Sequence, residues 1–229
     1  MKIKCSPLLW VGTSLKVTTR KQPQRAGTEK TKSGSRSVPA ASGRLRIIAG
    51  EWRSRQLPVL DLPGLRPTTD RVRETLFNWL QNDIAGARCL DLFAGSGALG
   101  FEAASRGAAS VTLLELQAAA ADQLAANMQL LQAKNMQLVR ADALDWLAQY
   151  QGEPFDLVFL DPPYASDLVE PAIHCLHQQQ LLSSDACVYI ECDAAQSLPQ
   201  LPPGWQLTKQ KKAGQVSYYL IRLSDATVD

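Results

Sequence analysis

Twelve residues, 89–100, decide the fold, and they read CLDLFAGSGALG. An apolar run leads into three glycines spaced Gly-x-Gly-x-x-Gly, which is typical of the turn between the first strand and first helix of a nucleotide-binding α/β domain. Domains that bind phosphate share this pattern. Here, however, Asp91 stands four residues before Gly95, and a carboxylate at this place repels a pyrophosphate but attracts an ammonium group. The stretch therefore predicts a nucleotide-like ligand that carries an amine.

Two further carboxylates follow the next two predicted strands. Glu115, twenty residues after Gly95, is placed to accept hydrogen bonds from both hydroxyls of a ribose, and Asp142 to accept one from the amino group of adenine. Each acid alone is better explained as a solvated carboxylate or a helix N-cap. Because ligands bind at the carboxyl ends of parallel strands, the ordered set of three indicates S-adenosylmethionine as the cofactor. The predicted cofactor-binding residues are Asp91, Phe93, Gly95, Ser96, Gly97, Gly100, Glu115, Leu116, Asp142 and Ala143.

Beyond residue 84, apolar strands alternate with helical patterns, which favours a parallel sheet with helices on both faces. Near the C-terminus two stretches rich in β-formers flank a glycine-containing turn and predict an antiparallel hairpin. The fold class is therefore α/β, Rossmann-like and mostly parallel. The expected strands are Arg88–Phe93, Ser110–Glu115, Met136–Arg140, Phe155–Asp161, Cys187–Cys192, Trp205–Lys211 and Val216–Leu223, with helices near 97–106, 117–132, 143–150 and 167–180.

A small β/α extension is expected before this domain, at residues 44–83. Residues 46–53 predict a short strand that runs into a turn, and the prolines between residues 58 and 67 predict a loop. Thr68, Thr69 and Asp70 are N-cap candidates for a helix over residues 70–81, whose apolar side chains share one face.

The second chemical motif is DPPY, residues 161–164, at the end of a buried strand. A base extruded from a nucleic acid needs an aromatic face to stack on and acceptors for its exocyclic amine. Tyr164 supplies the face, while the Asp161 carboxylate and the Pro162 carbonyl supply the acceptors. Guanine presents adjacent N–H donors that match a carboxylate, whereas adenine and cytosine place a ring acceptor beside the amine. The predicted catalytic residues are Asp161, Pro162, Pro163 and Tyr164.

Charge is distributed unevenly along the 229 residues. Residues 1–43 contain nine Lys and Arg against one acid, residues 44–73 contain seven against three, and residues 74–229 contain eight against eighteen. A basic front on an acidic body predicts a polyanionic partner. Residues 1–43 have few large apolar side chains and are expected to be a disordered basic tail, although their composition also resembles a transit peptide. The predicted RNA-binding residues are Arg46, Arg53, Arg55, Arg66, Arg71 and Arg73.

The composition also argues against two classes of protein. The longest apolar run near the start, Leu8–Val11, is far below the ~20 residues needed to cross a bilayer, so no membrane association is expected. Five cysteines without a Cys-x-x-Cys pair indicate neither a disulfide framework nor a metal site.

The stretch DLFAGSGALG (91–100) together with DPPY resembles class I methyltransferases that act on amines. RIIAG (46–50) and RPTTDRVRETLFN (66–78) narrow the resemblance to the RsmD family, the bacterial 16S rRNA guanine-N2 methyltransferases, over residues 44–223. It implies a seven-stranded class I methyltransferase sheet in residues 84–229, an RNA-facing extension at 44–83 and 16S rRNA of the small ribosomal subunit as the partner. We expect a cytoplasmic monomer. Two alternatives stay open: a DNA or RNA adenine-N6 methyltransferase, and a non-catalytic RNA-binding protein on the same fold.

Overall fold

A seven-stranded sheet forms the centre of the protein, which is described by a computed structural model for residues 41–61, 69–163 and 166–224. The strand order is β5-β4-β3-β6-β7-β9-β8. The predicted tail over residues 1–43 lies almost wholly outside the described residues. The strands are β3 (Arg88–Asp91), β4 (Ser110–Leu114), β5 (Met136–Val139), β6 (Phe155–Leu160), β7 (Leu182–Asp193), β8 (Trp205–Ala213) and β9 (Val216–Leu223).

The sheet is parallel from β5 to β7 and ends in an antiparallel hairpin, which confirms the predicted fold class. β3 lies between β4 and β6 and is parallel to both, so the chain order reverses there. Open α/β sheets bind ligands outside the carboxyl ends of the strands at such a switch point. β9 lies between β7 and β8 and pairs antiparallel with both, which brings the turn of the hairpin to the ligand-binding edge.

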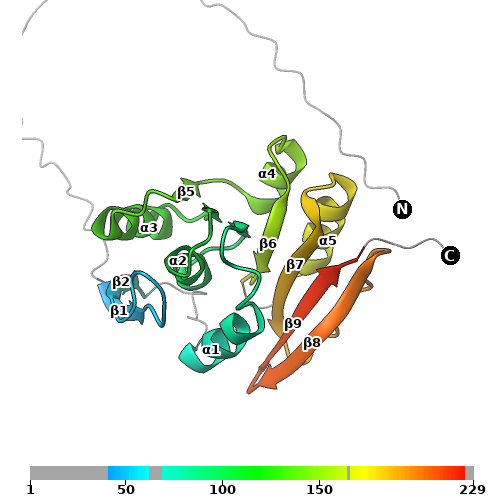
Figure 1. Cartoon of the computed structure of the whole chain (residues 1–229), viewed down its shortest axis with the longest axis horizontal. Helices are drawn as coiled ribbons and strands as arrows, with labels where there is room; N and C mark the ends of the chain where they lie inside the picture. The colour runs from blue at the N-terminus through cyan, green and yellow to red at the C-terminus, as the bar shows by residue number, and fades with distance from the viewer. Residues whose placement is uncertain (1–40, 62–68, 164–165, 225–229) are drawn as a thin grey trace, which may run out of the picture. The chain divides into compact units, whose positions relative to one another are not determined.

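Helices cover both faces of the sheet (Figure 1). One hydrophobic core joins the sheet to α1, α2, α3 and the first two strands of the chain, and a second joins the opposite face to α4 and α5. The periodicity predicted each end of these helices to within two residues. Their bounds are α1 (Asp70–Trp79), α2 (Ala98–Ser105), α3 (Ala118–Leu131), α4 (Ala143–Gln149) and α5 (Val169–Gln178). None of the described helices is both long and apolar enough to cross a membrane.

The N-terminal extension corrects one prediction. A short strand running into a turn was predicted over residues 46–53, followed by a loop from residue 58. In the structure the strand lies earlier, and β1 (Ala41–Arg46) pairs antiparallel with β2 (Gln56–Leu60). The turn between them uses left-handed backbone at Gly50, where a Cβ atom would meet the backbone of Ser105. Pro58 suggested a loop, but β2 pairs with β1 alone, and an edge strand tolerates a proline. The hairpin buries Leu57 and Val59 in the core shared with α1 to α3.

Candidate functional site

A cavity of about 800 Å³ opens at the carboxyl ends of the parallel strands. Its walls come from the segments that follow β3, β4, β5 and β6, from the end of β7 and from the turn between β8 and β9. Val59 of β2 and the start of α1 close another side. The structure brings these predicted residues together in the wall: Asp91, Phe93, Gly95, Ser96, Glu115, Leu116, Asp142, Ala143, Asp161, Pro162 and Pro163.

The end of β3 holds a buried carboxylate without a cation beside it. Asp91 is 2% exposed, lines the cavity and accepts a hydrogen bond of 3.0 Å from the backbone N–H of Gly100. Burial raises the pKa of Asp91 to about 7, opposed by this hydrogen bond and one from Phe93, with a smaller upward contribution from the charge on Glu115. No Lys or Arg among the described residues forms an ion pair with Asp91. The site therefore favours a ligand that brings its own positive charge.

Two of the predicted glycines shape the site without lining it. Gly97 has a φ of +77°, and a Cβ atom there would lie 2.5 Å from the ring of Phe101. At Gly100 a Cβ atom would collide with Leu113 and approach the Asp91 carboxylate to 3.1 Å. These glycines let α2 begin close against β3 and β4, which places the helix N-terminus behind the glycine-rich turn.

Glu115, directly after β4, ties two loops of the cavity together. Its Oε2 accepts from the backbone N–H of Gly95 at 2.9 Å, and its Oε1 accepts from that of Gln117 at 2.7 Å. Each carboxylate oxygen has a second acceptor site, so a ligand diol can still bind. Leu116, next to it, is 61% exposed and presents an apolar side chain at the cavity where an aromatic ring would pack.

Asp142, after β5, is both part of the cavity wall and the N-cap of α4. Its Oδ1 accepts from the backbone N–H groups of Leu144 at 2.9 Å and Asp145 at 3.1 Å. Both bonds use the same oxygen atom. Oδ2 is therefore not required for the cap and remains an acceptor for a ligand amine.

Asp161, Pro162 and Pro163 continue β6 into the cavity wall, beside the segment that follows β3, because β3 and β6 are neighbouring parallel strands. Tyr164, the fourth predicted catalytic residue, lies outside the described residues. Sequence reasoning missed Glu191, which lines the same cavity near the end of β7. It is 9% exposed, its Oε2 accepts from the Tyr189 hydroxyl at 2.8 Å, and burial raises its pKa. An acid near the end of an apolar strand was the available signal, the same one that pointed to Glu115.

The wall also contains residues that are remote in sequence from the motifs. Thr69 and Val72 come from the beginning of α1, and residues 213–216 form the turn of the C-terminal hairpin. Thr69 is the N-cap of α1 and accepts from the backbone N–H of Val72. No local sequence signal placed either segment here, because their position depends on the strand order.

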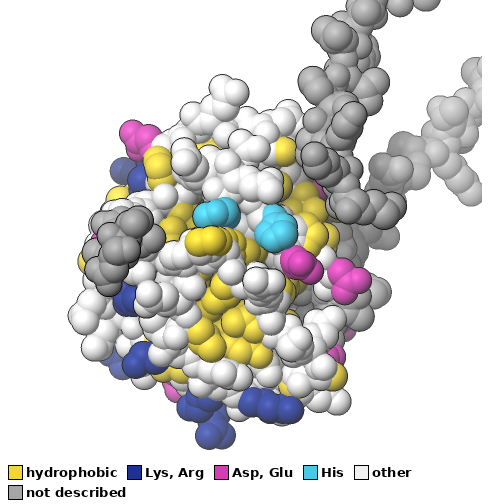
Figure 2. All heavy atoms as spheres, turned by 90° about the vertical axis from the view of Figure 1, so that its right-hand side faces the viewer, with side chains coloured by type: hydrophobic (Ala, Val, Ile, Leu, Met, Phe, Trp, Pro, Cys, Tyr) yellow, Lys and Arg dark blue, Asp and Glu magenta, His cyan; other side chains and the backbone are white. Residues whose placement is uncertain are grey.

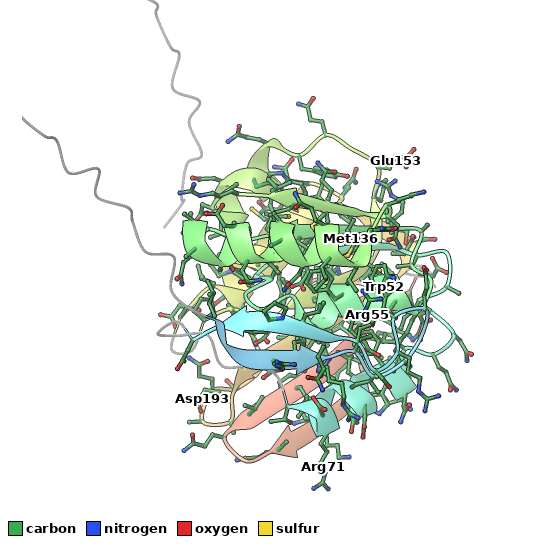
Figure 3. All side chains as sticks on the ribbon, turned by 90° about the vertical axis from the view of Figure 1, so that its left-hand side faces the viewer. Trp52, Arg55, Arg71, Met136, Glu153 and Asp193 are labelled. Carbon is green, nitrogen blue, oxygen red and sulfur yellow. The ribbon has the colours of Figure 1, made fainter. Side chains whose placement is uncertain are left out.

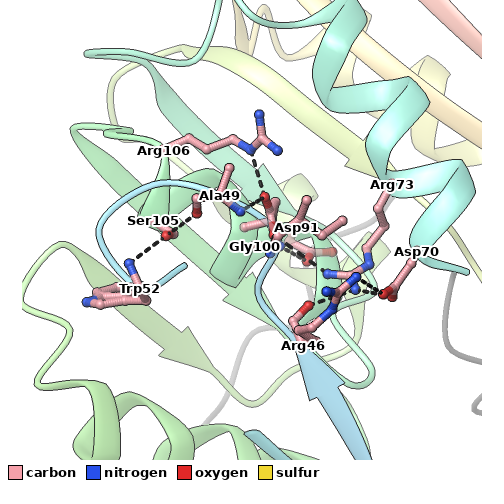
Figure 4. A network of polar contacts seen from close by, with 11 residues as sticks. Arg46, Ala49, Trp52, Asp70, Arg73, Asp91, Gly100, Ser105 and Arg106 are labelled. Atoms are coloured by element: carbon pink, nitrogen blue, oxygen red, sulfur yellow. Dashed lines mark hydrogen bonds and ion pairs between the residues drawn. The ribbon is translucent and has the colours of Figure 1, made fainter. Parts of the chain in front are cut away.

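Arg73 is a correction to the predicted RNA-binding residues. Its side chain is 1% exposed and lies between α1 and α2, where it contacts Asp70 at 2.6 Å and the fully buried Glu102 at 3.7 Å, and donates to the backbone oxygen of Arg46 at 2.8 Å (Figure 4). Glu102 also accepts from Arg106 at 2.7 Å. A guanidinium so enclosed holds the N-terminal extension to the sheet and cannot contact RNA.

The extension is fastened to α2 by further polar contacts. Glu102 accepts from the backbone N–H groups of Ile48 and Ala49, at 2.8 and 3.0 Å. Ser105 donates to the backbone oxygen of Ala49 and accepts from the N–H of Trp52 (Figure 4). The RIIAG stretch is therefore a structural joint as well as part of the family pattern.

Two of the other predicted arginines, Arg55 and Arg71, lie in different parts of the structure (Figure 3). Arg46 is exposed but pairs with Asp70 at 3.1 Å. Arg55 donates to the backbone oxygen of Leu130, near the end of α3 that is remote from the cavity. In Figure 3, Arg55 lies on the same side as Glu153, which precedes β6, and away from Asp193 at the end of β7. Arg53 and Arg71 are exposed, Arg71 on the first turn of α1, and Arg66 lies outside the described residues.

This strand order and the cavity at the strand ends define a class I methyltransferase fold. Two solved structures match it closely: the candidate methyltransferase yhhF from Escherichia coli (TM-score 0.75, 47% identity, 80% of this chain and 99% of that chain) and a candidate methylase from Haemophilus influenzae (TM-score 0.69, 45% identity, 80% and 100%).

Sequence comparison identifies the family. The family described as Conserved hypothetical protein 95 matches residues 45–222. "Ribosomal RNA small subunit methyltransferase D" of Escherichia coli is 51% identical over 181 residues, which is 79% of this chain and 91% of the relative. The Haemophilus influenzae protein of the same name is 50% identical over 186 residues, 80% and 96%. The chain belongs to this family of methyltransferases, as the resemblance predicted.

Proposed function

We propose that this protein transfers the methyl group of S-adenosylmethionine to the exocyclic N2 of a guanine in 16S rRNA, as a monomer that acts on the small ribosomal subunit. The observation that carries the proposal is the convergence of Asp91, Glu115, Asp142 and Asp161 on one cavity of about 800 Å³. Relatives at about 50% identity are named as methyltransferases of small-subunit rRNA, which supports the choice of substrate.

The residues fit the cofactor group by group. The buried Asp91 carboxylate has no cation beside it, so an ammonium group supplies the charge that the site lacks. Glu115 would accept from the ribose hydroxyls and Asp142 from the adenine amine. The exposed side chain of Leu116 would contact the adenine ring. Bound S-adenosylmethionine supplies an electrophilic methyl group on its sulfonium sulfur.

Asp161 and the backbone carbonyl of Pro162 orient the target amine. The lone pair of an exocyclic amine is delocalised into the base, and two acceptors on its hydrogens favour a pyramidal nitrogen that points along the line of transfer. Tyr164 is proposed to stack on the base, which needs an aromatic face after it leaves its neighbours. Once methylated, the nitrogen is cationic and loses a proton readily, so no strong base is needed beforehand.

The test is methyl transfer from labelled S-adenosylmethionine to unmodified small subunits, naked 16S rRNA and duplex DNA, followed by digestion to nucleosides. N2-methylguanosine from the rRNA substrates is the expected product. N6-methyladenosine would support the adenine methyltransferase instead, and no product from any substrate would favour a non-catalytic RNA-binding protein.

Asp161→Ala tests the assignment of the acceptor in the same assay. We expect turnover to fall at least a hundredfold, because Asp161 positions the amine, while the dissociation constant for the cofactor stays within about twofold. Asp167→Ala is the matched control, since Asp167 is exposed and does not line the cavity. Unchanged turnover in Asp161→Ala would remove this residue from the mechanism.

A further inference from the structure

The C-terminal hairpin carries a cluster of positive charge close to the cavity. Residues 74–229 contain eight Lys and Arg, and three of them, Lys209, Lys211 and Lys212, stand within four positions on β8. All three are exposed, and none forms an ion pair with another described residue. In the same segment Arg88, Arg106 and Arg222 each pair with a carboxylate.

These lysines lie on the strand that leads into the cavity wall. β8 ends at Ala213, and the turn that follows it is part of the cavity wall. At about 3.3 Å per residue, Lys211 lies two positions, roughly 7 Å, and Lys209 roughly 13 Å along the strand from that turn. Figure 2, which faces the β8 side of the molecule, shows Lys and Arg side chains gathered along its lower rim.

The strand register shows which way two of the lysines project. Lys209 lies opposite Leu220 and Lys211 opposite Tyr218 of β9, and both partners belong to the core on the α1 face of the sheet. Residues directly opposite each other in a ladder share a face. Tyr218 in turn packs against Trp79 of α1, with ring centroids 5.4 Å apart. Lys209 and Lys211 therefore project on the face of the sheet that α1 covers, and on this face the first turn of α1 reaches the cavity and exposes Arg71.

We propose that Lys209, Lys211 and Arg71 form a surface that binds the phosphate backbone of the RNA next to the base that enters the cavity. This inference rests on the proposed function. Exposed, unpaired ammonium groups on long side chains are suited to phosphates as mobile point charges. The acidic remainder of residues 74–229 repels a polyanion, so this basic rim orients the RNA toward the cavity.

The experiment compares Lys209→Gln/Lys211→Gln with Lys134→Gln in the full chain. Lys134 is an exposed lysine in the loop before β5, at the opposite end of the sheet, and serves as the matched control. Binding of unmodified small subunits and of naked 16S rRNA is titrated at several salt concentrations. We expect the double variant to lower the slope of log K against log salt by about 1.4–1.8 and to weaken binding roughly tenfold or more at 0.1 M salt. The Lys134 variant should keep the parental slope.

Further readouts separate this role from others. The Lys209→Gln/Lys211→Gln variant should raise the KM for RNA and leave both kcat at saturating RNA and the cofactor dissociation constant unchanged. The Lys209→Arg/Lys211→Arg variant, which keeps both charges, should show the parental salt slope. Lysines on an edge strand also prevent pairing between the sheets of two molecules. If Lys209 and Lys211 had only that role, the glutamine double variant would change its oligomeric state, while its monomeric fraction would keep the parental salt slope. A parental slope and KM in the double variant overturn the proposed surface. Failure of the unaltered protein to methylate guanine in any RNA overturns the proposed function instead.

Discussion

Two sites in this protein bury charged side chains, and they differ in whether an opposite charge of the protein contacts them. At the junction of α1 and α2, Arg73 and Glu102 are almost fully enclosed, and each contacts an opposite charge. At the end of β3, Asp91 is equally enclosed but accepts only backbone hydrogen bonds, and its pKa is raised to about 7. Both carry the cost of removing a charge from water. In the first site the fold itself supplies the compensation, whereas the second is compensated when a cationic ligand binds.

The largest expected effect is a loss of stability on replacing Arg73, at the site where the buried charges are paired. Arg73→Met should lower the free energy of unfolding by about 3–5 kcal/mol, because it leaves Asp70 and the buried Glu102 with fewer compensating contacts. Urea denaturation measures this change. Arg71→Met, two residues away on the exposed side of the same helix, is the matched control and should change it by less than about 0.5 kcal/mol. Equal, small losses in both variants would show that Arg73 does not anchor the extension.

At the unpaired site, replacing Asp91 should raise the free energy of unfolding rather than lower it. The folded-state pKa of Asp91 is raised from 3.8 to about 7, so ionisation destabilises the fold increasingly as pH rises from about 4 to 7. Asp91→Asn removes that penalty and should raise the free energy of unfolding at pH 8 by up to ~4 kcal/mol, with little change at pH 4. The same variant should bind S-adenosylmethionine more weakly. Denaturation at pH 4 and pH 8 measures the stability of the variant, and calorimetry measures its affinity for the cofactor. A lower free energy of unfolding at pH 8 than in the parent would show that ionised Asp91 does not destabilise the fold.

Glu115 lies between these two cases, because backbone groups already engage both of its oxygens. Glu115→Ala should raise the dissociation constant for S-adenosylmethionine roughly tenfold or more, since a hydrogen bond to a charged group contributes about 1.5–3 kcal/mol. Calorimetry measures the constant. An unchanged value would remove Glu115 from the ribose site, while Glu51→Ala, an exposed acid away from the cavity, should have no effect.

The sequence predicted the parts of the site that follow strands directly. Asp91, Glu115, Asp142 and Asp161 each come at the end of an apolar run, and the end of a parallel strand is a ligand-binding position whatever the rest of the chain does. The hairpin turn was missed because it reaches the cavity only when β9 inserts between β7 and β8, a pairing that no local pattern encodes. Glu191 was missed although it carries the same signal as Glu115, an acid near the end of an apolar strand.

Arg73 was misassigned for a related reason. Its buried partner Glu102 lies 29 positions further along, on a helix whose docking against α1 is a tertiary event. The charge pattern along the sequence therefore predicted a basic segment, but it could not show which of its cations form ion pairs within the fold. The same limit hid the hairpin lysines, which stand in a segment that is acidic overall.

Asp142 gives the smallest expected effect and the sharpest separation of a structural role from a ligand role. Its Oδ1 caps α4, and Oδ2 is the atom assigned to the adenine amine. Asparagine is also a good N-cap and would use its one carbonyl oxygen for the cap, so its amide nitrogen would face the adenine amine without accepting from it. Asp142→Asn should therefore keep the free energy of unfolding within about 0.5 kcal/mol and raise the cofactor dissociation constant roughly threefold to fivefold, since Asp142 is exposed and its bonds are weakened by solvent. Asp142→Ala should add a loss of about 1 kcal/mol in stability. If the asparagine variant binds the cofactor as tightly as the parent, Asp142 is an N-cap alone and the adenine amine has another acceptor.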